Sequence, residues 1–168
     1  MTTTFTHTAV GSLSTVISGV ATTGLRNLGN NTCRLGAEIT PTAAGPETKA
    51  TYQLQAKYTG GNPTAGAVVA HCWYVVDVGN SGVYPTIGAS SDGSSSVYPP
   101  QAPDFVFMWD LGTAHAGAPD VMVSVPRVVD RPAFKHKVLM RNVSGFATAN
   151  TNDTDTILKE SVYSDLGT

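Results

Sequence analysis

Residues 134–145 read FKHKVLMRNVSG, and this stretch decides the fold class. Its side chains alternate between two sets: one is Phe134, His136, Val138 and Met140, and the other is Lys135, Lys137, Leu139 and Arg141. A β-strand with one buried face and one wet face produces this period of two. The last four residues, 142–145, are typical of a turn. The stretch therefore predicts a strand that ends in a turn, and it carries no catalytic signature.

The same alternation recurs along the chain, with turns rich in Gly, Pro and Asn between the runs. It predicts further strands at 33–39, 50–56, 67–78, 105–111, 121–125 and 157–163. Many short strands with no helical pattern between them are typical of a β-sandwich or a jelly roll. We therefore expect an all-β protein, in which residues 25–168 form a single antiparallel β-sandwich domain like a jelly roll.

The N-terminal residues 1–24 differ from the rest, because they are rich in Thr, Ser and Gly with scattered apolar residues. Gly11, Gly19 and the β-branched residues between them argue against a stable helix. We expect an extended N-terminal arm with room for one strand. Such an arm either packs along its own domain or reaches onto a neighbouring subunit.

The most apolar part of the chain is 67–78, and both of its faces are apolar. Such a strand is either central and covered on both sides, or covered by a partner subunit. Trp73 shares its face with His71 and Asp77, so we expect it to be partly exposed on the monomer. Burial of this Trp against a partner subunit would make it an interface anchor.

The composition excludes several classes of function. Only 13% of the residues are charged, about half the usual share, and the formal net charge is −2. The chain therefore lacks the basic footprint of a nucleic-acid-binding protein. No apolar run is long enough to span a membrane, and no basic residue precedes an apolar run at the N-terminus as in a secretory signal. We expect a protein that is soluble before assembly and binds neither nucleic acid nor membrane.

No arrangement of residues predicts chemistry. The 4 histidines are far apart in the sequence, and their spacing matches no metal motif. No Gly-x-Ser-x-Gly elbow is present, and no pair of carboxylates stands out for glycoside cleavage. We therefore expect no enzymatic activity, no cofactor and no metal.

Two features leave alternatives open. The loop 150–155 is rich in oxygen ligands and could hold calcium, but it lacks the regular twelve-residue pattern that ends in Glu, so a solvated turn is the simpler interpretation. Cys33 and Cys72 each lie in an apolar run. They form a disulfide if their strands meet with the right geometry, and otherwise they remain buried thiols.

A carbohydrate-binding β-sandwich module is the alternative from a different functional class. Trp73, Trp109 and the 6 tyrosines could supply an aromatic platform on which a sugar stacks. Trp109, however, shares its pattern with Phe105 and Phe107, which is typical of a core residue.

Four features follow one another along the chain. The segment 13–19 leads through a loop into 30–39, and the apolar strand 71–76 is followed by a Ser-Asp-Gly turn at 91–93. A strand at 105–111 comes next, and the chain ends with the motif F-K-x-K-V-x-x-x-N-x-S-G and a final strand that closes at Tyr163. This order resembles a family of small β-sandwich virion structural proteins of tailed bacteriophages. The chain departs from the family in its longer connection between Asp77 and Asp92.

The resemblance implies a capsid decoration (cement) protein on the surface of the phage head. Its expected partners are the major capsid protein and other copies of itself, most simply as a trimer, and no catalytic residues carry over. The same features would suit a tail, collar or fibre-attachment protein.

The strand at 134–143 supplies the best-defined candidate contact. Lys135, Lys137 and Arg141 form a row on one face and are three of only 10 basic residues. Lysines on a solvated edge strand discourage unwanted pairing, which is the simpler interpretation. The sharper interpretation is a basic stripe that meets an acidic capsid surface, with Trp73 as a second contact. On the opposite face, we expect Phe134, Val138 and Met140 to complete a core with Phe105, Phe107 and Trp109.

Overall fold

The protein is built from β-strands. The computed structural model describes residues 5–19, 24–41, 49–77, 79, 81–85, 99–109, 121–124 and 126–167, with the side chains of β1 described from residue 14 and those of β11 up to residue 162. The strands are β1 (Phe5–Ile17), β2 (Cys33–Leu35), β3 (Lys49–Ala56), β4 (Tyr58–Thr59), β5 (Val68–Val76), β6 (Phe105–Met108), β7 (Met122–Val123), β8 (Arg127–Asp130), β9 (His136–Asn142), β10 (Ala147–Thr148) and β11 (Ile157–Gly167). The described residues contain no helix, and therefore none that could cross a membrane. The all-β prediction is confirmed.

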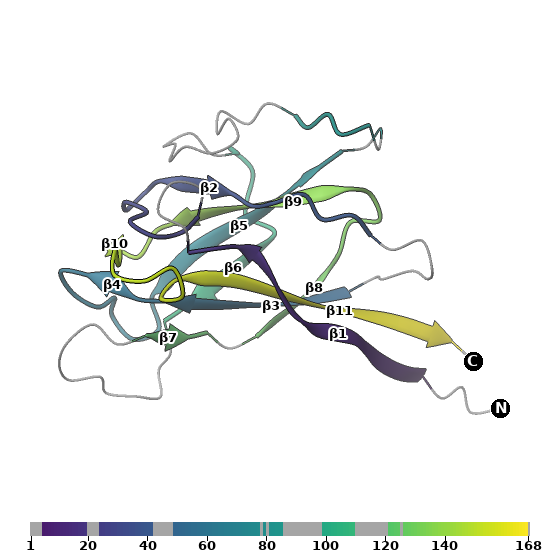
Figure 1. Cartoon of the computed structure of the whole chain (residues 1–168), viewed down its shortest axis with the longest axis horizontal. Coiled ribbons are helices and arrows are strands. Elements are labelled where there is room, and N and C mark those ends of the chain that lie inside the picture. Colours follow the sequence, from purple (N-terminus) through teal and green to yellow (C-terminus); the bar gives the residue numbers. More distant parts are fainter. Residues whose placement is uncertain are drawn as a thin grey trace.

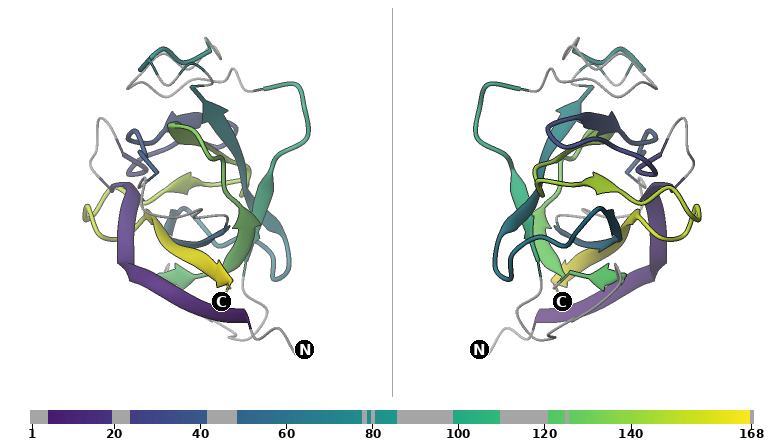
Figure 2. Two further views of the ribbon diagram at one scale, coloured as in Figure 1. Left: turned by 90° about the vertical axis from the view of Figure 1, so that its right-hand side faces the viewer. Right: turned by 90° about the vertical axis from the view of Figure 1, so that its left-hand side faces the viewer.

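The strands form two facing sheets, as in a β-sandwich (Figures 1 and 2). One sheet has the order β1-β11-β3-β7, with β8 also paired to β3, and the other has the order β2-β9-β5-β6. The short strands β4 and β10 pair with each other. All of these pairings are antiparallel.

The main core lies between the two sheets, where aromatic rings dominate. The Tyr52 ring of β3 stacks on the Phe105 ring of β6 with 4.7 Å between centroids, and Phe107 meets Phe105 edge to face at 5.7 Å. Val138 and Met140 of β9 are buried in the same core, as predicted. Alternate residues of each strand thus supply the apolar surface whose burial holds the sheets together.

Phe134 does not join this core, although its place in the alternation predicted that it would. Its side chain is 48% exposed. The reason is that β9 begins only at His136, so Phe134 lies in the preceding turn and is outside the period-two register of the strand.

The predicted turn after β9 is held by a buried amide. The Asn142 side chain donates from Nδ2 to the carbonyl oxygens of Leu28 (3.0 Å) and Phe146 (2.8 Å), and its Oδ1 accepts from the Ser144 hydroxyl at 2.7 Å. Gly145 follows with φ of +89°, a conformation that favours glycine. The Asn-x-Ser-Gly motif at the end of β9 is therefore structural, because it joins the loop before β2 to the loop before β10.

Strand β5 is central and covered on both faces, as the apolar run predicted. The register places Cys72 of β5 opposite Met140 of β9, whereas Cys33 of β2 lies opposite Arg141, the next residue of β9. Successive residues of a strand point to opposite faces. The two cysteines therefore lie on opposite sides of the sheet, and both are free and buried.

Strand β1, near the N-terminus, pairs with β11, the last strand of the chain. Along its length β1 pairs with β11, from Phe5 opposite Gly167 to Ile17 opposite Leu158. Val16 and Ile17 are buried in the main core, so this end of β1 packs on its own domain. The other end runs outward beside the end of β11, away from the two layers (Figure 1).

Candidate interface

The outer face of the β2-β9-β5-β6 sheet gathers three of the four residues that the sequence singled out, Trp73, Lys137 and Arg141, whereas Lys135 lies just before β9 begins. The register sets Arg141 beside Cys33 and His71, Leu139 beside Leu35 and Trp73, and Lys137 beside Val75. Cross-strand neighbours share a face of the sheet. We call this surface the outer face and define it by these residues: Cys33, Leu35, His71, Trp73, Val75, Lys137, Leu139 and Arg141.

Trp73 is buried within its own chain, which overturns the expectation that it is partly exposed. Its side chain is 2% exposed and packs with Cys33, Val75 and Leu139 in a second apolar cluster. The indole Nε1 donates to the carbonyl oxygen of Gln101 at 3.1 Å. The physical reason is that the connection between β5 and β6 folds back over the outer face, and the position of a long loop cannot be deduced from alternation.

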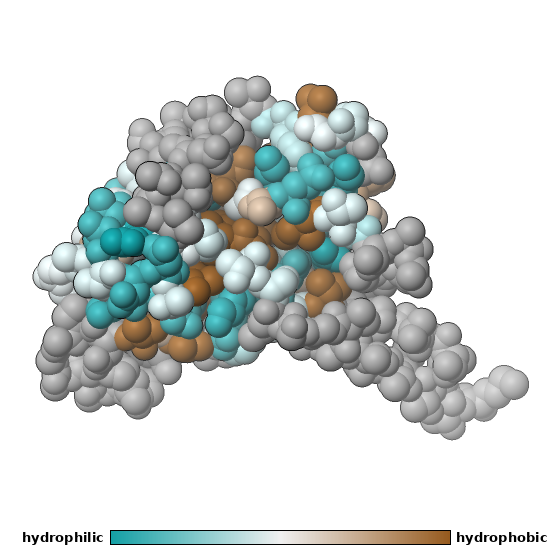
Figure 3. Space-filling view, viewed as in Figure 1, coloured by the Kyte–Doolittle hydropathy of each residue, from teal (hydrophilic) through white to brown (hydrophobic). Residues whose placement is uncertain are grey.

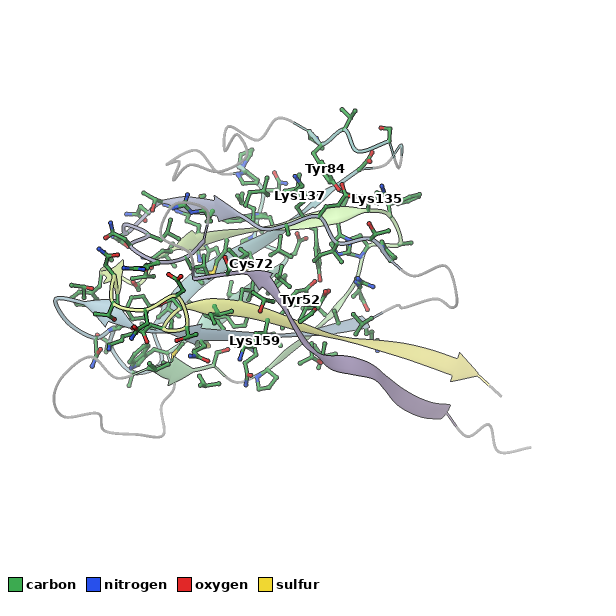
Figure 4. All side chains as sticks on the ribbon, viewed as in Figure 1. Tyr52, Cys72, Tyr84, Lys135, Lys137 and Lys159 are labelled. Atoms are coloured by element: carbon green, nitrogen blue, oxygen red, sulfur yellow. The ribbon has the colours of Figure 1, made fainter. Side chains whose placement is uncertain are left out.

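A tyrosine from the same connection lies over the row of basic residues. The Tyr84 hydroxyl donates to Glu38 Oε2 at 2.8 Å, and the ammonium of Lys135 lies 3.4 Å from Glu38 Oε1. Lys137 Nζ lies 4.6 Å from the centroid of the Tyr84 ring, in a cation–π contact. Figure 4 shows Tyr84, Lys137 and Lys135 gathered over β9. Two of the three basic side chains are thus engaged by one tyrosine and one carboxylate.

The electrostatics of this cluster follow from its contacts. The hydrogen bond from Tyr84, and then the charge of Lys135, lower the pKa of the Glu38 carboxyl. Desolvation, followed by the hydrogen bond to Glu38, raises the pKa of Tyr84 to about 12. Glu38 is therefore ionised and Tyr84 is a neutral donor near pH 7, so the acid offsets part of the positive charge of the row.

The connection is also tied to the sheet by two aspartates at its ends. Asp77 accepts a hydrogen bond through Oδ2 from the backbone N–H of Gly82. Asp104 accepts one through Oδ2 from the N–H of Tyr74 at 2.7 Å. The described parts of the connection, 81–85 and 99–104, are therefore anchored to β5 at both ends.

Arg141 occupies the other end of the row. Its Nη2 donates to Asn31 Oδ1 at 3.0 Å. Burial raises the pKa of the Cys33 thiol to about 11 in spite of the nearby Arg141 charge. Burial, with the same charge adding to it, lowers the pKa of His71. Cys33 is consequently a protonated, unreactive thiol, and His71 is neutral near pH 7.

The oxygen-rich loop after β10 is held by an arginine. Arg26 donates from Nε to Asn150 Oδ1 at 2.8 Å and from Nη1 to Asp153 Oδ1 at 2.9 Å. The Thr151 hydroxyl donates to Asp155, whose pKa is lowered first by this bond. Across the described part of the chain, no three His, Cys, Asp or Glu side chains come close enough to share a metal ion. The loop is a polar turn clamped to the loop before β2.

A charged pair inside the sandwich was not predicted from the sequence. Arg131 Nε lies 3.3 Å from Glu160 Oε1, and the Tyr52 hydroxyl donates to the same oxygen at 2.6 Å. Glu160 shares one face of β11 with Leu158 and Val162, so the period of two could have placed it on the inner face. Arg131 follows β8 in a turn, and no local pattern indicates its burial.

Comparison with protein-family models, with curated proteins and with solved structures finds no match to this chain.

Proposed function

We propose that this protein is a virion structural protein that works by assembly with other protein subunits. The observation that carries the proposal is the order in which the strands pair. β1 pairs with β11, β2 with β9, β3 with β8, and β5 with β6. These pairs are nested, as if one long antiparallel hairpin with its tip between β5 and β6 had been wound into two layers.

Nested pairing of this kind supports a jelly roll, in which eight strands form two facing sheets through Greek-key connections. Viral capsid domains use this architecture, although lectins and cupins use it as well. Here the weak charge, with only 13% charged residues, and the absence of a catalytic pattern in the sequence favour a structural role.

The contacts of the two tryptophans weigh against the carbohydrate-binding alternative. Trp73 and Trp109 are both buried, at 2% and 6% exposure, so neither presents its ring face to solvent. A sugar-stacking platform needs an exposed aromatic face. The two tryptophans therefore give the sugar-binding alternative no support, and it rests on the tyrosines and the oxygen-rich loop 150–155.

Two virion roles fit this proposal. The resemblance of the sequence to phage decoration proteins favours a cement protein that binds the major capsid protein on the head surface as a small homo-oligomer. The nested strand order favours a second role, a subunit of the shell itself, because capsid shells are built from jelly-roll domains.

The copy number in purified particles tests the proposal and separates the two roles. A decoration protein is present alongside a separate major capsid protein in comparable copy number, and purified chain rebinds to stripped particles. A shell subunit is itself the most abundant protein, and the purified chain forms closed particles visible by electron microscopy. Absence from purified particles, together with a purified chain that neither forms particles nor binds capsids, would overturn the proposal.

A further inference from the structure

The outer edge of β1 is an unpaired strand edge. Within the described chain β1 stands at the end of its sheet, with β11 on one side and no strand on the other. A free strand edge presents a row of N–H and C=O groups that can pair with a further strand. The 13 residues of Phe5–Ile17 make this an unusually long edge.

The first four residues of β1, 5–8, belong to a ribbon of only two described strands. The last described residue pair that joins β3 to β11 is Lys49 with Tyr163, so among the described strands only β1 lies beside β11 beyond Tyr163. Figure 1 shows this ribbon leaving the two layers at the lower right. A two-stranded ribbon is at best marginally stable in water, because it lacks a third strand or a packing partner. An additional strand along β1 would supply what this ribbon lacks.

Among the residues that the structure describes, none of the usual devices protects this part of the edge. Exposed edges are normally blunted by charged residues, proline or bulges. The sequence of Phe5–Ile17 contains no Lys, Arg, Asp, Glu or Pro. Its register shifts lie between Val10 and Ser14 and between Thr15 and Ile17, whereas Phe5–Val10 runs in unbroken register with β11. Within the described part of the chain, the segment Phe5–Val10 is therefore regular, free of Lys, Arg, Asp and Glu, and open to pairing.

We propose that Phe5–Val10 is a self-association edge, which pairs antiparallel with the same segment of a second copy of this chain. An antiparallel pair of identical edges is related by a two-fold axis, so each copy supplies the donors and acceptors that the other needs. Because the segment has no Lys, Arg, Asp or Glu, and His7 counts as neutral at pH 7, the pairing brings no like charges together. The two β1-β11-β3 sheets then become one continuous sheet across the axis.

The alternative edge of the ribbon is less suited to this contact. Beyond Tyr163, β11 offers only 164–167, and this stretch contains Asp165. Pairing β1 of one copy with β11 of the next would also be a heterologous contact, which propagates instead of closing. The inference predicts a two-fold dimer in place of the trimer that the family resemblance implies. It stands whether or not the protein belongs to a virion.

Sedimentation velocity of the full chain over a range of concentrations tests the inference. The wild type should show a monomer–dimer equilibrium. The double variant Thr6→Lys/Thr8→Lys should dissociate it with a Kd about tenfold higher or more, because like charges then face each other across the axis. The control Thr59→Lys/Thr64→Lys makes the same charge change at two exposed threonines outside β1 and should leave the Kd unchanged.

Hydrogen exchange of the same samples locates the contact. Amides of residues 5–10 should gain protection as the concentration rises through the Kd, and the Thr6→Lys/Thr8→Lys variant should lose this gain. A chain that stays monomeric throughout, or a dimer whose new protection lies elsewhere, would overturn the inference. If residues 5–10 gain protection only when purified capsids are added, the edge binds a different protein and the second-copy assignment is wrong.

Discussion

Arg131 and Glu160 form an ion pair inside the sandwich, with 3.3 Å between Nε and Oε1 and only 3% of each side chain exposed. The Tyr52 hydroxyl donates a hydrogen bond to the same carboxylate oxygen at 2.6 Å. Desolvation is the first cause of the raised pKa of this Tyr, and the negative charge of Glu160 adds to it. The pair joins the turn after β8 to β11, two segments that no main-chain pairing connects.

Replacing Glu160→Gln should destabilise the protein strongly. The amide keeps the size of the side chain but removes the negative charge that Glu160 places 3.3 Å from the buried guanidinium of Arg131. Breaking one side of a buried pair costs about 3–5 kcal/mol, which for a chain of this length lowers the Tm by roughly 6–20 °C. Differential scanning calorimetry at pH 7 measures the change.

The exposed pair of Arg26 with Asp153 provides the matched control. The same charge neutralisation, Asp153→Asn, should change the stability by less than about 1 kcal/mol, because water screens the exposed pair. The apolar double variant Arg131→Met/Glu160→Leu should recover much of the loss, since neither charge is then left buried alone. Equal effects of Glu160→Gln and Asp153→Asn would show that the buried pair has no special role.

Mild acid should weaken the fold through His136. This residue is fully buried at the start of β9, its ring meets the Tyr74 ring edge to face at 5.3 Å, and its Nδ1 lies 2.9 Å from the Phe134 carbonyl oxygen. Burial, with the charge of Arg131 adding to it, lowers its pKa against the raising effect of the Phe134 contact. Between the unfolded and the folded pKa, the unfolded chain therefore binds more protons than the folded one.

Stability contributed by neutral His136 is therefore complete above its unfolded pKa of about 6.5 and is lost as the pH falls below that value. Urea titrations between pH 7.5 and 5 should show a falling free energy of unfolding, and His136→Gln should flatten this dependence. The control His71→Gln, at a less buried histidine, should flatten it less. A wild-type free energy that does not change across this window contradicts the assignment.

The strands were predictable because a period of two is a local property of the sequence. Val138 and Met140 alternate with Lys137 and Leu139, and the structure buries the first two in the main core. The alternation did not indicate that Leu139 is also buried, because its cover comes from the connection between β5 and β6. Whether one face of a strand is exposed to solvent depends on which other segment packs over it. The alternation along a single strand does not indicate that segment.

For the same reason, the pairing of strands that are distant in the sequence could not be predicted. The first and last strands pair across nearly the whole chain, with Phe5 opposite Gly167. Arg131 and Glu160 meet although neither lies in a segment that pairs with the other. The mixed apolar and polar pattern of residues 5–17 predicted at most one strand and gave no partner for it. A period describes a strand, but a partner is selected by the tertiary fold.

Trp73→Ala should affect stability and not ligand binding. Truncating a buried Trp removes its packing against Cys33, Val75 and Leu139 and leaves a cavity, at a cost of about 3–5 kcal/mol. Trp73→Phe retains most of the packing and loses the hydrogen bond to Gln101, at a cost of about 1 kcal/mol from that bond. Chemical denaturation measures both changes. A fully stable Trp73→Ala protein that has lost binding to a glycan or a capsid would restore the surface-anchor hypothesis.

An exposed apolar patch is a second candidate contact surface besides the basic row. Figure 3 shows apolar surface at the lower left, in the region of β7, where Val123 is 49% exposed. Further apolar surface appears in the centre of this view, among hydrophilic residues. The row of Lys135, Lys137 and Arg141 therefore competes with a second, apolar candidate for contact with other subunits, and substitutions can separate the two.

Charge reversal tests the proposed capsid contact of the basic row. If this row meets an acidic capsid surface, Lys137→Glu/Arg141→Glu should weaken binding to purified capsids by at least tenfold and reduce the dependence of that binding on salt. Lys49→Glu reverses an exposed charge on the other sheet and should have no effect on binding. Val123→Ser tests the apolar patch in the same pull-down or light-scattering assay.

The Tm of each variant must be measured as well, because the basic residues also make contacts within their own chain. Lys137→Glu exchanges the cation over the Tyr84 ring for an anion near Glu38, so it should loosen the connection between β5 and β6. Lys137→Met removes the cation–π contact without adding a negative charge and separates the two effects. If Lys137→Met and Lys137→Glu lower the Tm equally while the Lys137→Glu/Arg141→Glu variant binds capsids like the wild type, the row is structural. In that case, its positive charges position Tyr84 and Glu38 on the outer face and take no part in capsid binding.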